Sequence, residues 1–422
     1  MAKQKLSPKI GSGLMGYGNR ISASTGVHDD LYIRVVVLDD GKNKSVFCSI
    51  EVCYLRAPQV HEIRDYVTRQ SDLLAENIFI TTTHTHSAPA AHDISAWNVP
   101  FVESIGSTIL EANEAMQSAK IGVGGGLLLG YSINRRWLDR PVDPAVGVIR
   151  VDTIEGKPMA VIGNFACHAV VMGYDNFLIS GDWPGYASRN LEEMLGEDCV
   201  AIFMQGGAGD VNPLTETVQE HLTNGDPVIT IGELTSYYGD KEMALSEGWN
   251  IEDRAGGTFA ECEALARAYS AEVQRIWRRI KTVADSQIWS EHIMVDAGLS
   301  DDEAKPETIP DFFKQLIPGI SNEALRLEIM LIGIGNTVIV GQPGESFSET
   351  SLDFRKVCQQ LGYDYAMFVT YANGSYGYLP PENAFSEGGY EVDWPLAIGI
   401  SRYTQARIQT AIMPILKKHI PK

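Results

Sequence analysis

Apolar residues occur along the chain in two alternating patterns, short continuous runs and longer stretches with helical spacing. The runs have the length of strands that are buried on both faces, whereas the stretches repeat an apolar residue every three or four positions. The runs predict strands at residues 31–38, 45–53, 77–80, 121–135, 147–152, 159–168, 199–204, 325–340 (a pair) and 365–370. The helical spacing predicts helices at residues 58–75, 101–116, 186–195, 259–280, 346–361 and 398–417. Because strands and helices alternate, we expect an α/β fold of mixed β-sheets flanked by helices.

Two long stretches interrupt this alternation. Residues 214–257 are polar, acidic and rich in Thr, Tyr and Gly, and residues 297–322 contain an acidic cluster and three prolines. Long irregular segments of compact domains often carry function, so we interpret both as insertions or lids over a pocket. No internal repeat is evident in the sequence.

Composition and charge exclude several classes of protein. The 422 residues are 44% hydrophobic and carry a formal net charge of −20, so extended binding to a nucleic-acid backbone is excluded by repulsion. No run approaches the roughly 18 apolar residues that a membrane span needs, and the N-terminus has no stretch of signal-peptide type. The six dispersed cysteines, without a CxxC pair, indicate reduced buried thiols in a cytoplasmic protein. We expect a small-molecule substrate and no stable membrane insertion. Whether the chain forms a homo-oligomer stays an open question.

Polar clusters follow the predicted strands, and together they suggest one site. They contain His84 and His86, Asn134 and Arg135, His168, Gly206–Asp210, Gly344 and Glu345, and Asn373–Tyr378. In open α/β sheets ligands bind outside the carboxyl ends of the strands. His84 and His86 are two residues apart, so in continued extended geometry both imidazoles would lie on one face.

Each of these residues also has a purely structural interpretation. A lone histidine such as His168 is often a satisfied core residue, Glu345 has the charge that a helix N-terminus favours, and Tyr378 fits an apolar core. Taken together, separated histidines with a glutamate and a tyrosine form a nitrogen and oxygen ligand set that Zn²⁺ accepts. Manganese or iron would accept the same set.

Several short blocks, in this order, resemble the catalytic domain of the neutral/alkaline non-lysosomal ceramidases, which hydrolyse the amide bond of ceramide with zinc. The blocks are Met15-Gly16-Tyr17, Gly26-Val27-His28, Thr83-His84-Thr85-His86-Ser87, Ile133-Asn134-Arg135, Asn164–His168, Ser180–Ser188, Gly209–Pro213, Pro343-Gly344-Glu345, Asn373–Tyr378 and Tyr390-Glu391. The resemblance implies a single catalytic domain over residues 1–422, with the fold of the ceramidase N-terminal domain. It also implies that the C-terminal immunoglobulin-like domain of ceramidases is missing.

The resemblance assigns roles to individual residues of this chain. It makes His84, His168, Glu345 and Tyr378 the zinc ligands. It makes His86 a second active-site histidine that does not hold the metal, Arg135 an essential arginine and Tyr390 a second tyrosine over the site. Any of these last three would stabilise a tetrahedral oxyanion, where one donor is typically worth ~3 kcal/mol.

One block departs from the family pattern. Asp210 and Asn212 lie in the block where the family carries its proposed serine nucleophile, and both are catalytic candidates here, although Asn212 has no hydroxyl to attack with. The two long polar segments fit a small polar substrate better than a lipid. We therefore expect a zinc-dependent amidohydrolase acting on such a substrate. The alternatives are a metal-dependent ester or lactone hydrolase or a lyase on sugar-like compounds, and a non-catalytic metal-binding homologue.

Overall fold

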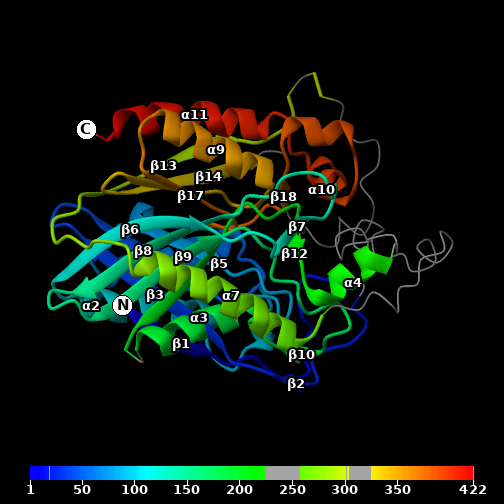
Figure 1. Cartoon of the computed structure of the whole chain (residues 1–422), viewed down its shortest axis with the longest axis horizontal. Coiled ribbons are helices and arrows are strands. Elements are labelled where there is room, and N and C mark those ends of the chain that lie inside the picture. The colour runs from blue at the N-terminus through cyan, green and yellow to red at the C-terminus, as the bar shows by residue number, and fades with distance from the viewer. Residues whose placement is uncertain (19, 197, 225–256, 301, 304–324, 422) are drawn as a thin grey trace.

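Three four-stranded sheets of the same construction form the centre of the fold (Figure 1). The structure is a computed structural model and describes residues 1–422 except 19, 197, 225–256, 301, 304–324 and 422. In each sheet an edge strand and two successive strands run antiparallel, and a helix then leads to a fourth strand parallel to the third. The sequence shows no repeat, so this threefold recurrence of one topology appears only in the structure.

The strand boundaries follow the apolar runs closely. The first sheet contains β1 (Ala2–Leu6), β3 (Leu31–Asp39), β4 (Lys44–Ile50) and β5 (Ile78–Thr82). The second contains β6 (Ala119–Leu127), β8 (Ala145–Thr153), β9 (Pro158–Phe165) and β11 (Val200–Gln205). The third contains β13 (Ile288–Asp296), β14 (Arg326–Ile334), β15 (Thr337–Gly341) and β17 (Tyr365–Val369). Three short pairs are β2 (Gly26–Val27) with β10 (Leu178–Ile179), β7 (Ser132–Asn134) with β12 (Val211–Pro213), and β16 (Glu345–Ser346) with β18 (Tyr378–Leu379).

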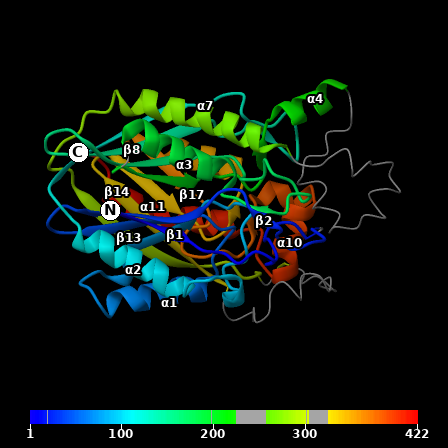
Figure 2. The same ribbon diagram turned by 90° about the horizontal axis from the view of Figure 1, so that it is seen from below.

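A pair of helices covers the outer face of each sheet, as Figures 1 and 2 show from two sides. The pairs are α1 (Ala57–Thr68) with α2 (Phe101–Glu114), α3 (Asp182–Leu195) with α7 (Phe259–Trp277), and α9 (Ser348–Gln360) with α11 (Thr404–Lys418). Two further helices, α4 (Glu216–Asn224) and α10 (Tyr390–Ile398), lie with the short strand pairs at one end, on the right in Figure 1. No helix among the described residues is long and apolar enough to cross a membrane.

The inner faces of the three sheets share one hydrophobic core. Along β3, Val36 and Leu38 point into this shared core, whereas Val35 and Val37 pack in the cluster under the covering helices. Successive side chains of a strand point to opposite faces, so a strand buried on both faces is apolar throughout. This explains why the strands are marked by continuous apolar runs.

Several predicted boundaries are wrong for identifiable reasons. The stretch 121–135 is two strands, β6 and β7. The final helix, predicted from residue 398, is α11 and begins at Thr404, because Gly399 ends the separate helix α10 with a φ of +85°. Helix α3 begins at Asp182 rather than at residue 186. The edge strands β1 and β13 were not predicted, because β1 (AKQKL) is mostly polar and the apolar residues of β13 (IWSEHIMVD) are interrupted by a polar block.

Two further expectations concern the long segments and the cysteines. Of the two segments interpreted as lids, residues 225–256, 301 and 304–322 lie outside the described residues, and residues 216–224 form α4. All six cysteines are free and buried, as predicted.

Candidate active site

The candidate site lies where the parallel strand pairs of all three sheets end. His84 follows β5, His168 follows β9, Glu345 follows β15, and Tyr378 follows β17. The three sheets face a common core, so the loops that leave their carboxyl ends converge at one end of the molecule. Ligand atoms of His84, His168 and Glu345 all lie within 4.8 Å of one another. Residues up to 261 positions apart in the sequence are thereby brought together.

The loop after β5 does not continue the strand, so the predicted basis for pairing His84 with His86 is wrong. Strand β5 ends at Thr82, and His84 has a φ of +63°, in the left-handed region. The amide of Thr83 donates to the carbonyl of Ile50, and the amide of His84 donates to the carbonyl of Val52 in the loop after β4. The two imidazoles nevertheless meet, with 3.0 Å between their Nε2 atoms.

Backbone carbonyls select the tautomer of both candidate ligand histidines. Nδ1 of His84 lies 2.8 Å from the carbonyl oxygen of Cys53, and Nδ1 of His168 lies 2.5 Å from that of Ala208. A carbonyl only accepts, so each Nδ1 carries the proton and each Nε2 keeps its lone pair. Burial lowers the pKa of His84 and of His168 to about 3, so both rings are neutral.

Three electron pairs therefore face one another in a buried space. The Nε2 atoms of His84 and His168 are 3.1 Å apart, and Oε2 of Glu345 lies 3.7 Å and 3.5 Å from them. Oε2 of Glu345 is buried and has no hydrogen-bond partner in the described part of the chain. Such donors repel one another unless a cation lies between them, so the residues present fit a bound metal ion.

Tyr378 is placed beside Glu345 by the short parallel pair β16 and β18, in which the two residues are direct partners. The Tyr378 hydroxyl accepts a hydrogen bond of 2.9 Å from Nη2 of Arg135. Burial raises the pKa of Tyr378, and the guanidinium of Arg135 opposes this rise. The neutral phenol is therefore the favoured form, and Arg135 reduces the cost of the phenolate that would bind a metal.

His86 occupies a tight position next to these ligands. The ring of Tyr17 packs edge-on against it at 4.8 Å, and Nη1 of Arg20 donates to its carbonyl at 2.8 Å. Gly16 makes room for the imidazole, since a Cβ there would lie 2.3 Å from Cγ of His86. Nδ1 of His86 is buried against Gly16 without a hydrogen-bond partner among the described residues, and Nε2 is the ring nitrogen that faces His84.

Each of the three guanidinium nitrogens of Arg135 has a hydrogen-bond partner. Besides Tyr378, it donates from Nε to Oε1 of Glu391 at 2.8 Å and from Nη1 to Oδ1 of Asn212 at 3.4 Å. Tyr390 is partly buried, with its ring 5.5 Å from that of Tyr378. Arg135, Asn212 and Tyr390 thus adjoin the candidate ligands.

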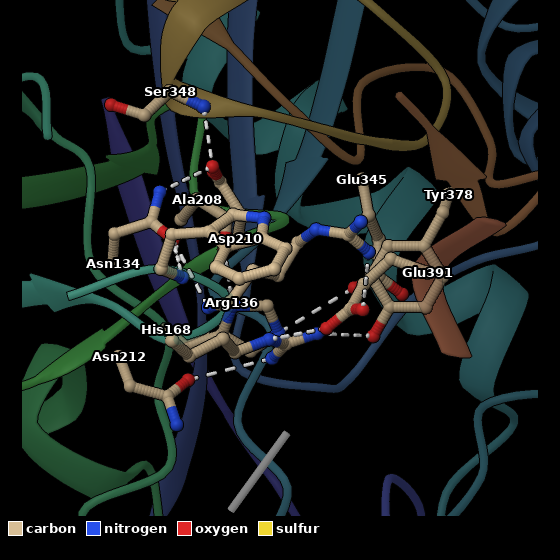
Figure 3. A network of polar contacts seen from close by, with 12 residues as sticks. Asn134, Arg136, His168, Ala208, Asp210, Asn212, Glu345, Ser348, Tyr378 and Glu391 are labelled. Carbon is tan, nitrogen blue, oxygen red and sulfur yellow. Dashed lines mark hydrogen bonds and ion pairs between the residues drawn. The ribbon is translucent and has the colours of Figure 1, made fainter. Parts of the chain in front are cut away.

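Asp210 lies on the other side of the site, between Asn134 and Ser348, as Figure 3 shows. Its Oδ1 accepts from the amide of Ser348 at 2.8 Å and its Oδ2 from the side chain of Asn134 at 2.7 Å. Burial raises its pKa to about 6. These contacts join the loops of two sheets, so they support a positioning role, and its catalytic role stays a prediction.

Sequence reasoning missed two parts of the site. The carbonyls of Cys53 and Ala208 leave no trace in residue type, because any residue supplies a carbonyl. Tyr371 has a φ of +53°, its ring stacks on His84 at 3.9 Å, and its buried hydroxyl has no partner in the described structure. Only its position after a strand, next to the cluster of residues 373–378, could have suggested it.

Comparisons with known proteins agree on one family. Residues 7–300 match the family described as neutral/alkaline non-lysosomal ceramidase, N-terminal. Neutral ceramidase of Mycobacterium tuberculosis is 28% identical over 466 residues, covering 90% of this chain and 70% of that protein. Neutral ceramidase B of Dictyostelium discoideum is 29% identical over 240 residues, covering 48% of this chain and 33% of that protein, so the match spans about a third of its length.

A solved structure shows the same fold. The crystal structure of neutral ceramidase from Pseudomonas aeruginosa superposes with a TM-score of 0.76 at 19% identity, covering 100% of this chain and 74% of that one. The predicted fold class is therefore confirmed.

Proposed function

The chain belongs to the neutral/alkaline non-lysosomal ceramidase family, and on this premise we propose that it is a zinc-dependent hydrolase that cleaves an amide bond. The observation that carries the proposal is the set of facing lone pairs on His84, His168 and Glu345. Both histidines are held in the tautomer that a metal needs, and the carboxylate oxygen has no other partner in the described structure.

We assign the zinc ion to His84, His168, Glu345 and Tyr378, whose nitrogen and oxygen donors suit zinc. Bound there, it would polarise a carbonyl and lower the pKa of a water toward roughly 7. Arg135 supports the set by keeping a positive charge 2.9 Å from the Tyr378 oxygen.

Three other side chains would act on the substrate. Arg135 presents a fixed guanidinium that stabilises the oxyanion formed when the carbonyl is attacked. His86, whose Nε2 lies 3.0 Å from Nε2 of His84, would exchange a proton with the leaving nitrogen. Tyr390, packed on Tyr378, would donate to the same oxyanion.

Asn212 changes the way the bond is attacked. Its carboxamide offers no nucleophile, and its oxygen accepts from Arg135 at 3.4 Å. We therefore assign it to holding the guanidinium, and the attacking oxygen comes from water. Hydrolysis in ¹⁸O-labelled water should then place one labelled oxygen in the acid product.

The proposed substrate is a small polar amide. The support comes from composition, because the segments 214–257 and 297–322 are polar and acidic. A panel of N-acyl compounds that ranges from N-acetylated amino acids and sugars to ceramide would test this choice. Turnover of ceramide above all short-chain amides would overturn it without touching the proposed chemistry.

The proposed function is tested by metal analysis of purified protein and of two variants. We expect about one equivalent of zinc and amide hydrolysis in the wild type, and loss of both in His168→Ala. The control is His61→Ala, since His61 is exposed on α1 and away from the candidate ligands. Less than about half an equivalent of zinc in the wild type, or unchanged hydrolysis in His168→Ala, would overturn the proposal. A product that forms without incorporating labelled oxygen would favour a lyase.

A further inference from the structure

We propose that Glu391 is a positioning residue that fixes the guanidinium of Arg135 in the active site. The inference rests on the proposed function, because it adds a residue to the same site. Glu391 lies in the first turn of α10, and its side chain is 5% exposed. Its Oε1 accepts from Nε of Arg135 at 2.8 Å, and its Oε2 accepts from Nη1 of Arg136 at 2.9 Å.

Both oxygens of this carboxylate are thus used by two consecutive arginines of the loop after β7. Figure 3 shows Glu391 next to Tyr378 and in contact with Arg136. The Arg135 side chain is only 4% exposed, so water cannot replace a lost partner, and a buried guanidinium without its carboxylate is costly.

The contact at Nε determines where the other nitrogens point. A guanidinium is planar, so anchoring Nε to Glu391 fixes the direction of Nη1 and Nη2. In that orientation Nη2 meets the Tyr378 hydroxyl and Nη1 meets Asn212. A donor held in place before the reaction needs no reorganisation when the oxyanion forms, which is why such donors are effective.

A second carboxylate that contacts the loop after β7, Glu387, offers a matched control. Glu387 pairs with Arg136 at 3.3 Å, with Arg140 at 3.0 Å and with the Trp137 indole at 3.1 Å. Its side chain is 18% exposed, compared with 5% for Glu391. Glu387→Gln therefore removes a carboxylate that binds the loop after β7, and it leaves the Arg135–Glu391 pair intact.

The test compares Glu391→Gln, Glu387→Gln, Arg135→Gln and the double variant Glu391→Gln/Arg135→Gln in kcat, KM and zinc affinity, the last by competition with a chelator. We expect Glu391→Gln to lower kcat about 10- to 100-fold with KM within about threefold, and to weaken zinc binding about tenfold through Tyr378. Glu387→Gln should stay within about twofold of the wild type. In the Arg135→Gln background, Glu391→Gln should have no further effect.

Equal effects of Glu391→Gln and Glu387→Gln would overturn the inference, and so would additive effects in the double variant. If Glu391→Gln does not fold, Glu391→Asp keeps the charge, and the inference requires kcat between those of the wild type and Arg135→Gln. The measurement of zinc affinity separates this inference from the proposed function, because that measurement needs no amide turnover. A selective loss of zinc affinity in a protein that hydrolyses no amide would support the role of Glu391 and overturn the proposed reaction.

Discussion

Replacing Gly16 by alanine tests whether the position of His86 matters for catalysis. Gly16 has a φ of +116° and lies against the imidazole of His86. A Cβ there would lie 2.3 Å from Cγ, 2.5 Å from Nδ1 and 2.7 Å from Cβ of His86. The substitution adds one methyl group and leaves every proposed ligand and donor chemically unchanged.

The size of the effect follows from these contacts. Ordinary van der Waals contact begins at 3.4 Å, so the imidazole must retreat by about 1 Å. A displacement of about 1 Å at a reacting group can cost about 100-fold in rate, so we expect kcat to fall by about that factor. The positive φ adds strain of about 1–2 kcal/mol, which should appear as a loss in the free energy of unfolding. Zinc content should stay near that of the wild type, because His86 is not a proposed ligand.

The assay measures kcat on the best amide substrate, zinc content and thermal unfolding for Gly16→Ala and for Gly13→Ala. Gly13 is exposed in the same loop, has no atom within 4 Å of an added Cβ, and should tolerate alanine. A folded Gly16→Ala with kcat within twofold of the wild type would refute the role given to His86. Loss of zinc in the same variant would instead show that the displaced ring also disturbs His84, whose Nε2 lies 3.0 Å from that of His86.

Three further predictions concern the stability of the protein. Chelation should lower the thermal midpoint, because zinc at 1,000 times its Kd would contribute about 4 kcal/mol; equal midpoints in chelator and zinc would contradict this. Tyr371→Phe should leave the free energy of unfolding unchanged or raise it by up to about 1 kcal/mol, because the buried hydroxyl has no partner in the described structure. A loss of the free energy of unfolding, measured with urea, would show that the Tyr371 hydroxyl has a hydrogen-bond acceptor. Burial raises the pKa of Asp182 from 3.8 to about 6, so the folded state binds more protons than the unfolded state in that range, and stability should fall as pH rises from about 4 to about 6. In Asp182→Asn, the free energy of unfolding measured with urea should fall less steeply with pH over this range. An unchanged dependence on pH would exclude Asp182 as its source.

Much of the fold was predictable because its strands are buried on both faces. The run that became β3 contributes alternate valines to two cores, so hydrophobicity alone marks it. The edge strand β1 has only its ends buried, and its mixed pattern AKQKL resembles a loop. The start of the last helix at Thr404 depended on Gly399, which ends α10 in a left-handed conformation that is visible only in the structure.

The candidate ligands were predictable as residue types at strand ends, and their number and order came from the resemblance to a family. The sequence could not show why these side chains suit a metal. The tautomers of His84 and His168 depend on the carbonyls of Cys53 and Ala208, and the backbone has the same composition at every residue. Whether Asp210 faces the ligands or supports a loop depended equally on the packing around it.

The sequence by itself determined the local elements and the chemical inventory, because burial pattern and side-chain type are properties of each residue and its near neighbours. It also determined that position 212 carries no nucleophile, which follows from the carboxamide of Asn212 alone. The tertiary structure decided the convergence of three sheets of one topology, and with it the 3.1 Å between the Nε2 atoms of His84 and His168. It also decided the pairing of Arg135 with Glu391 across 256 positions. Such distances arise from how distant loops pack at a common core, and no local pattern of residues encodes them.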